Sequence, residues 1–182
     1  MSMICSVLGV SPVQIIALRA NPALASYLAM HIDDVRAPGS ATPGALAALG
    51  PLAAALDLHK SWHILHYLFT GEVGPAKSPA DALMSGEELG EDLGYGPPRL
   101  HDAQATRAIG EFLTAQTREK LQAQVDLRAM QRAGVYAISM GARAGADEEN
   151  ELRDEVAAYF APLRDYVLAM AAKQHGLLIW LS

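Results

Sequence analysis

Two short apolar runs, one at each end of the chain, are the clearest feature of the hydrophobic pattern. One covers Met3–Val10 and the other Leu177–Leu181. Both have the length and the aliphatic composition of buried strands. A single strand cannot satisfy its own backbone hydrogen-bonding groups, so we expect these two strands to share one small sheet.

Between the two runs, apolar residues recur at the three- and four-residue spacing of amphipathic helices. Ser11, Pro12 and Gln14 provide a cap, a proline at the first helical position and the partner of a capping box. The helix predicted to begin at Asp147 is the longest, and Pro162 inside it predicts a kink. Helix caps are also predicted at Asp102, Thr117 and Asp126.

In the middle of the chain the hydrophobic pattern is less regular, but it predicts further elements. Residues 45–58 predict helix on either side of a Gly-Pro break, and Lys60–Thr70 predicts a helix that ends at Gly71. Glu72–Leu100 is rich in glycine and proline but contains several leucines, which predicts an irregular, packed segment. Val135–Ile138 predicts a short strand.

Together these elements predict an α+β fold, a helix-rich single domain over residues 1–182. The helices would pack around a small sheet that includes the N- and C-terminal strands. The chain has 182 residues, of which 51% are hydrophobic and 19% charged. This length and composition support one sizeable core and exclude a disordered or collagen-like chain.

The charge balance narrows the classes of partner. Twenty acidic against 14 basic residues leave a net charge of −6, and no basic stripe is visible, so we expect no nucleic-acid partner. No apolar run approaches the roughly 20 residues of a membrane helix, so no membrane association is predicted. The chain has one cysteine, Cys5, and a poor signal-peptide pattern, which favours a cytoplasmic location. The oligomeric state is not predicted.

Three histidines in the Trp62 region are candidates for chemistry. His59, His63 and His66 stand at i, i+4 and i+7, within an arc of about 60° on one helix. A neighbouring pair could share a metal ion if an acid from elsewhere completed the site. The interpretation that we favour is structural: His63 and His66 flank the apolar face of the helix, where a histidine bonds a backbone carbonyl or a buried carboxylate and holds a loop in place. We therefore predict no cofactor and no metal, with His63 and His66 as weak metal candidates.

A second candidate region is the acidic, glycine-rich Glu87–Tyr95 loop. Glu91 and Asp92 of this loop could act as general acid and base, or form an anionic surface for a basic partner. The simplest interpretation is that Lys60, Arg99 or a histidine pairs with these acids and fixes the loop. Glycines of the loop would then serve turns at positive φ.

These two regions also carry a resemblance to a known family. The stretch KSWHILHYLFTG at Lys60–Gly71 resembles the KSWHxxHYLLTG signature of the YfbM-like family, small bacterial proteins of unknown function. Three further segments agree in order: Gly86–Pro97 (GEELGEDLGYGP), Gly134–Tyr136 and Leu178–Ser182. The chain departs from the family pattern at His59, where an acid is usual, and at Ala137, where proline often follows. The resemblance implies a single α+β domain and no assigned activity.

We predict a pocket between the Lys60–Tyr67 helix and the Glu87–Tyr95 loop. Its role would be non-enzymatic: the protein would bind a basic protein partner or a small ligand there. The alternative is a metal-dependent or acid–base hydrolase that uses His63, His66 and an acid of the loop. The candidate pocket residues are Lys60, Trp62, His63, His66, Asp92 and Tyr95.

Overall fold

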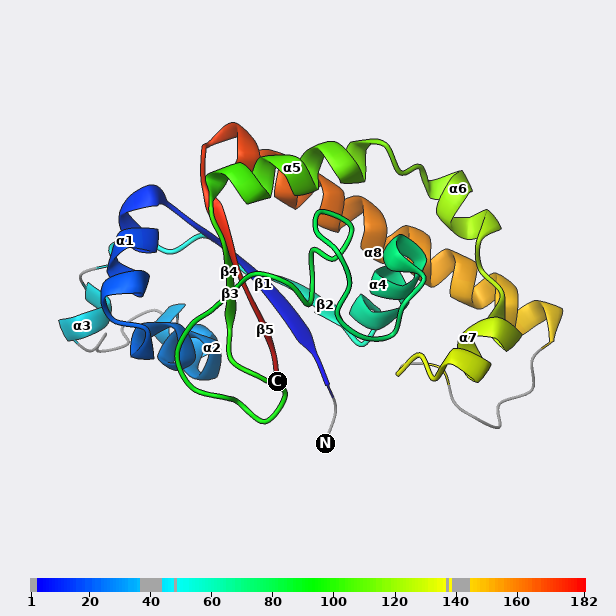
Figure 1. The fold of residues 1–182 in the computed structure, drawn as a ribbon, viewed down its shortest axis with the longest axis horizontal. Helices are drawn as coiled ribbons and strands as arrows, with labels where there is room; N and C mark the ends of the chain where they lie inside the picture. Colours follow the sequence, from blue (N-terminus) through cyan, green and yellow to red (C-terminus); the bar gives the residue numbers. More distant parts are fainter. Residues whose placement is uncertain (1–2, 37–43, 48, 137, 139–144) are drawn as a thin grey trace.

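A computed structural model describes residues 3–36, 44–47, 49–136, 138 and 145–182 (Figure 1). It contains one antiparallel sheet with the strand order β2-β1-β5-β4-β3. The strands are β1 (Cys5–Val10), β2 (Leu56–His59), β3 (Glu87–Glu88), β4 (Arg99–His101) and β5 (Gly176–Leu181). The helices are α1 (Pro12–Ala20), α2 (Ala23–Arg36), α3 (Gly44–Ala47), α4 (Trp62–Thr70), α5 (Ala103–Thr114), α6 (Arg118–Ala123), α7 (Leu127–Ala133) and α8 (Ala146–Ala172).

The two terminal strands lie side by side at the centre of the sheet. β1 and β5 pair along their whole length, with Val7 opposite Ile179 and Leu8 opposite Leu178. All residues of β5 are buried, since neighbouring strands flank it on both edges and helices cover both faces. The prediction of an α+β fold built around a sheet of the two terminal strands is confirmed.

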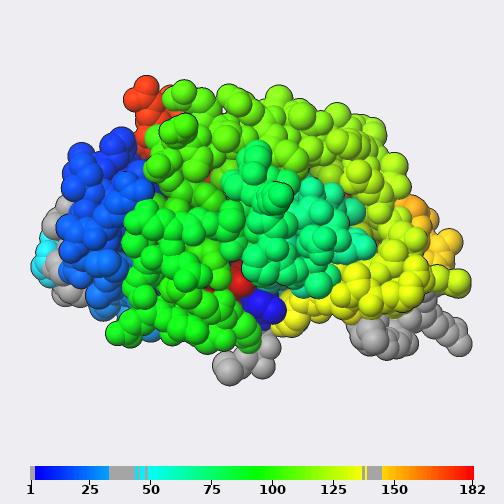
Figure 2. All heavy atoms as spheres, viewed as in Figure 1, coloured from blue at the N-terminus to red at the C-terminus, as the bar shows by residue number. Residues whose placement is uncertain are grey.

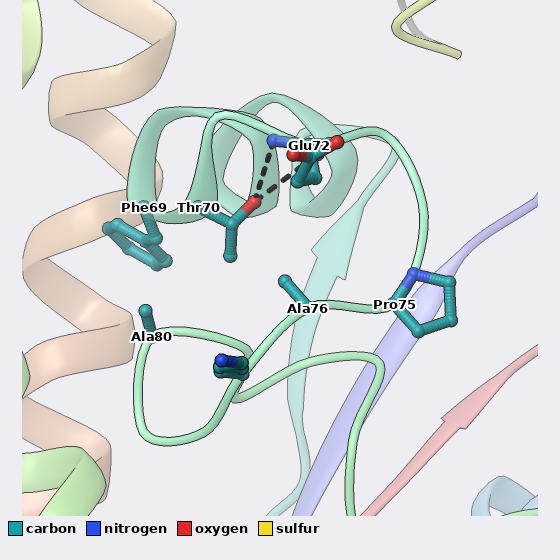
Figure 3. Close-up of a pocket in the computed structure, with 7 residues that line it drawn as sticks. Phe69, Thr70, Glu72, Pro75, Ala76 and Ala80 are labelled. Atoms are coloured by element: carbon teal, nitrogen blue, oxygen red, sulfur yellow. Dashed lines mark hydrogen bonds between the residues drawn. The ribbon is translucent and has the colours of Figure 1, made fainter.

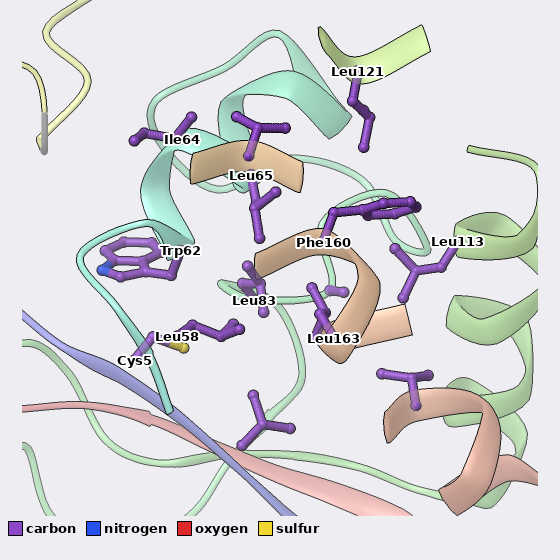
Figure 4. Packing of buried hydrophobic residues seen from close by; sticks show 14 of the residues in the cluster. Cys5, Leu58, Trp62, Ile64, Leu65, Leu83, Leu113, Leu121, Phe160 and Leu163 are labelled. Carbon is purple, nitrogen blue, oxygen red and sulfur yellow. The ribbon is translucent and has the colours of Figure 1, made fainter. Parts of the chain in front are cut away.

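Alternation of side chains along the central strands divides the core into two clusters, one on each face of the sheet. Val7 and Ile179 point into the larger cluster, which α4 to α8 cover (Figure 1). Figure 4 shows part of this cluster, with Trp62 of α4 and Phe160 of α8. Leu8 and Trp180 point into the smaller one, which α1, α2 and α3 cover. The fold is therefore a sheet between two unequal helical layers, and residues on α4 are separated by the sheet from residues on α2.

Most helix ends follow the local signals. Ser11 and Gln14 form the predicted capping box of α1, and the side chain of Asp102 accepts from Ala105 N at the start of α5. Thr117 and Asp126 cap α6 and α7 in the same way. Gly71 ends α4 in the left-handed conformation (φ 77°), as predicted. These signals succeed because a cap involves residues only two or three positions apart.

Two predicted elements and the predicted cap of the longest helix are wrong. Leu56–His59 forms the edge strand β2 because Leu58 is buried against the large cluster while its neighbours are more exposed. Val135, Tyr136 and Ile138 lie in turns outside any strand, and Ala137 is outside the described residues. The long helix α8 begins at Ala146, and Gly145 is its cap, so Asp147 lies in the first turn instead.

Two interior positions of the long helices depart from the simplest helical pattern. Pro162 lies inside α8, which continues as helix through it to Ala172, with Phe160 and Leu163 buried on either side. The irregularity lies in α2, which runs on to Arg36 past a non-helical residue at His31 (φ −127°).

Candidate functional site

The histidines of α4 anchor the segment that follows the helix. His63 and His66 are both buried, and their Nε2 atoms lie 2.8 Å from the carbonyl oxygens of Val73 and Gly74. A carbonyl oxygen can only accept, so Nε2 carries the hydrogen in both rings. The interpretation of these histidines as loop anchors is confirmed.

The other nitrogen of His63 is also engaged. Its Nδ1 accepts a hydrogen bond from Tyr136 N at 2.8 Å, which requires the neutral imidazole. Burial lowers the pKa of His63, and the nearby His66 lowers it further, although the bond to Val73 O acts in the opposite direction. Both ring nitrogens of His63 are therefore occupied by backbone groups, and neither is available to a metal ion.

A buried carboxylate secures the same segment from within. Asp81 accepts hydrogen bonds from Ala76 N at 2.8 Å and Met84 N at 2.9 Å, and its Oδ1 lies 3.5 Å from His66 Nδ1. On β4, His101 Nε2 donates to Ala82 O at 3.0 Å. The segment of residues 72–85, here called the anchored segment, is thus tied to both α4 and the sheet.

The anchored segment forms one wall of a hollow of about 590 Å³ beside the end of α4 (Figure 3). Thr70 stands at its rim, but its hydroxyl already donates to His66 O at 2.7 Å and accepts from Glu72 N at 3.0 Å. The remaining polar lining consists of the exposed side chains of Glu72 and Lys77. No set of uncommitted polar groups converges among the residues that line this hollow.

The acidic Glu87–Tyr95 loop is docked on the opposite helical layer. Arg19 of α1 forms an ion pair with Glu87 at 2.7 Å, and Ser26 Oγ of α2 accepts a hydrogen bond from Glu91 N at 2.6 Å. Asp92 Oδ1 accepts from the backbone amides of Gly94 (2.7 Å) and Gly96 (2.9 Å), which closes the turn.

Arg99, one of the partners predicted for Glu91 and Asp92, forms an ion pair with a different acid of the loop, Glu88, at 3.7 Å. Lys60, His63 and His66 form none with the loop in the part of the chain that the structure describes. Arg19 and Ser26 were missed by sequence analysis. Neither residue belongs to a motif, and no local signal connects them with a loop more than 60 residues away.

The structure does not bring the six candidate pocket residues together. Trp62 is almost fully buried and its Nε1 donates to Met3 O at 3.3 Å, while His63 and His66 lie behind it in the same helix. Lys60 is exposed just before α4. Tyr95 packs at the margin of the cluster that contains Trp62, whereas Asp92 lines a separate groove. In Figure 2, atoms from the two ends of the chain are visible between α4 and the acidic loop.

The separate groove has a volume of about 600 Å³ and lies between α2, the end of the sheet and the acidic loop. We call it the acidic groove. Its carboxylates are Asp57, Glu91 and Asp92, and its apolar lining includes Ile4, Met30, Ile32, Leu93 and Trp180.

No arrangement for metal chemistry is present in the described ranges. No three His, Cys, Asp or Glu side chains of these residues are grouped so that they could hold a metal ion. Cys5 is fully buried, and burial raises the pKa of its thiol, with Asp57 contributing in the same direction. A buried thiol with a raised pKa is a poor nucleophile. Among the described helices none is long and apolar enough to cross a membrane.

The buried neutral histidines predict acid sensitivity. We expect the free energy of unfolding to fall between about pH 6.5 and pH 5.5, because an unfolded histidine takes up a proton near pH 6.5. Burial keeps the pKa of His63 and that of His101 below this value, so the unfolded state binds more protons in this window. Each histidine can change the unfolding constant by at most about tenfold per pH unit.

Urea unfolding of the wild type at a series of pH values measures this effect. The control variant is His59→Gln, which removes an exposed histidine and leaves the buried histidines in place. An unfolding free energy that stays constant across the window would show that the buried histidines accept protons as readily as unfolded ones.

Comparisons with known proteins identify the fold and the family of this chain, and the proteins that they find are of unknown function. The chain is similar to the protein of unknown function YfbM from Escherichia coli, with a TM-score of 0.64 at 18% sequence identity. The similarity covers 98% of this chain and 99% of that one, and it concerns the fold. There is no significant match to a curated protein. The family described as a domain of unknown function, DUF1877, matches residues 1–180. The chain therefore belongs to the DUF1877 family.

Proposed function

We propose that this protein is a non-enzymatic binding protein that takes a basic segment of another protein in the acidic groove. The observation that carries the proposal is a set of three carboxylates around an apolar hollow that has no lysine or arginine in its lining. Glu91 and Asp92 form no ion pair within the described residues, and Asp57 has only His59 beside it, at 3.5 Å. The neighbouring acids Glu87 and Glu88 differ in this respect, since arginines of the chain itself pair with them.

The lining of the groove fits the shape of a basic side chain. Lysine and arginine have long apolar stems that favour contact with apolar surface while the charged head remains near water or a carboxylate. Ile32 and Leu93 offer such a surface inside the groove, and Met30 is 60% exposed at its margin. The volume of about 600 Å³ lies in the range of sites that bind specific ligands.

The overall charge supports the same class of partner. A net charge of −6 attracts cationic partners over several ångströms and raises their association rate at low salt. The α4 half of the region predicted from the sequence takes no part in this proposal, because its histidines are committed to the anchored segment.

The proposal predicts that Glu91 contributes to the affinity for cationic peptides. Its side chain is exposed and forms no hydrogen bond within the described residues, so Glu91→Gln removes one charge and leaves the loop contacts in place. The probes are 12-residue peptides that contain arginine, lysine and leucine. At low salt, we expect the dissociation constant of Glu91→Gln for these peptides to be about fivefold higher than that of the wild type. Isothermal titration calorimetry measures this difference.

The matched control is Glu111→Gln, which makes the same change of charge at an exposed position of α5, on the other helical layer. It should leave the affinity close to that of the wild type. If both variants weaken binding equally, the attraction comes from net charge and the groove is not the site. If peptides with glutamine in place of every lysine and arginine bind equally well, the partner is not basic.

A further inference from the structure

A fully buried imidazole and a fully buried carboxylate face each other behind the anchored segment. His66 and Asp81 are both 0% exposed, and His66 Nδ1 lies 3.5 Å from Asp81 Oδ1. The Nε2–H of His66 is already assigned by its bond to Gly74 O. The buried Nδ1 has no hydrogen-bond partner within ordinary bonding distance and angle. The protonation of this pair therefore depends on whether a proton lies between His66 Nδ1 and Asp81 Oδ1.

The surroundings of Asp81 supply hydrogen bonds but no other counter-charge. Both carboxylate oxygens accept from backbone amides, those of Ala76 and Met84. The titratable groups that face the pair are His63 on the same helix and His101 on β4; Glu72 and Lys77 lie in exposed positions. Burial lowers the pKa of both flanking histidines, so they do not supply positive charge at neutral pH.

Without a shared proton this arrangement would be unfavourable in two ways. A fully buried carboxylate would carry its charge with no cation beside it, which proteins rarely tolerate. In addition, the lone pair of Nδ1 would face a negatively charged oxygen in a region of low dielectric. One proton placed between the two atoms removes both penalties.

The neighbouring ring provides the contrast. His63 and His66 stack with ring centroids 6.1 Å apart, and both donate from Nε2 to successive carbonyl groups. His63 Nδ1 faces a donor, the amide of Tyr136, whereas His66 Nδ1 faces an acceptor. Two histidines on one turn of helix therefore need opposite protonation at the same ring atom.

We infer that His66 and Asp81 form a buried proton site: the pair holds one proton at neutral pH, and this proton locks the anchored segment onto α4. The proton resides on His66 Nδ1 as an imidazolium, or on Asp81 Oδ1 as a carboxylic acid. In either form it completes the contacts that hold Val73 to Met84 against the helix. Its loss would set a bare imidazole nitrogen against a carboxylate and favour release of this segment.

Nitrogen-15 and carbon-13 NMR of the wild-type protein at pH 7 tests the inference directly. We expect either that both ring nitrogens of His66 are protonated or that the carboxyl carbon of Asp81 has the shift of an acid. Both results support the site and say which atom carries the proton. His63 is the internal control, with an unprotonated Nδ1 in the same spectrum. An unprotonated His66 Nδ1 together with an ionised Asp81 would overturn the inference.

A second measurement uses the dependence of stability on pH. Between pH 7.5 and 8 an unfolded histidine is mostly neutral, so a native state that keeps the extra proton becomes less stable as the pH rises. We expect the unfolding constant of the wild type to increase with pH about fivefold to tenfold more per pH unit than that of Asp81→Asn. This variant keeps the shape of the side chain but not its charge. The window ends at pH 8 because the raised pKa of the Cys5 thiol adds a similar dependence above it. An equal slope in both proteins would contradict the site.

Discussion

Replacing Gly90 with alanine is expected to detach the acidic loop from α2 and to lower the free energy of unfolding by about 2–4 kcal/mol. Gly90 has a φ of 81°, which an alanine adopts only with strain. An added Cβ would also lie 2.7 Å from Pro22 O, a backbone atom that cannot move aside, and would collide with Ser26 Oγ. Because Ser26 accepts from Glu91 N, the contact that docks the loop would be lost as well.

The matched control for this prediction is Gly94→Ala in the same loop. Gly94 has a similar φ of 99°, but nothing lies within 4 Å of the position that its Cβ would take. The conformational cost of about 1–2 kcal/mol is therefore expected alone. Urea unfolding of the two variants separates backbone strain from the close approach to α2. Equal losses of stability would mean that the loop does not press on α2 as the structure describes.

Asp81→Ala is expected to destabilise the protein by about 3–5 kcal/mol, the range for breaking a buried charged pair by removal of one partner. The substitution leaves the buried amides of Ala76 and Met84 without an acceptor and His66 without its counter-group. The anchored segment should then exchange its amide hydrogens faster than the central strands do. Chemical unfolding and hydrogen exchange measure the two effects.

Asp92→Ala is the matched control for Asp81→Ala. Asp92 also accepts from two backbone amides, those of Gly94 and Gly96, but its side chain is exposed to solvent. Water can replace the lost acceptor there, so a cost of about 1 kcal/mol is expected. If Asp81→Ala costs no more than Asp92→Ala, burial does not strengthen the contacts of Asp81.

The most conspicuous motifs of the sequence mainly hold parts of the fold together. His63 and His66 hold the anchored segment, and the acids of the loop pair mainly with nearby backbone or with arginines. The sequence predicted loop anchoring by the histidines because each contact spans only eight to ten residues. It could not predict the pairing of Arg19 with Glu87, since 68 residues separate them and neither residue type is unusual at its position.

The sequence by itself determined the terminal strands, most helix starts and the family. These features depend on apolar alternation and on capping contacts between residues a few positions apart, which the order of residues encodes directly. Only the tertiary structure decided where the motifs lie relative to one another. Trp62 packs on the face of the sheet into which Val7 points, whereas Leu89 and Leu93 pack on the face of Leu8. Which face a loop covers depends on long-range packing against the central strands. The sheet therefore separates Trp62 from Leu89 and Leu93 of the loop, while Tyr95 at the end of the loop packs on the face of Trp62.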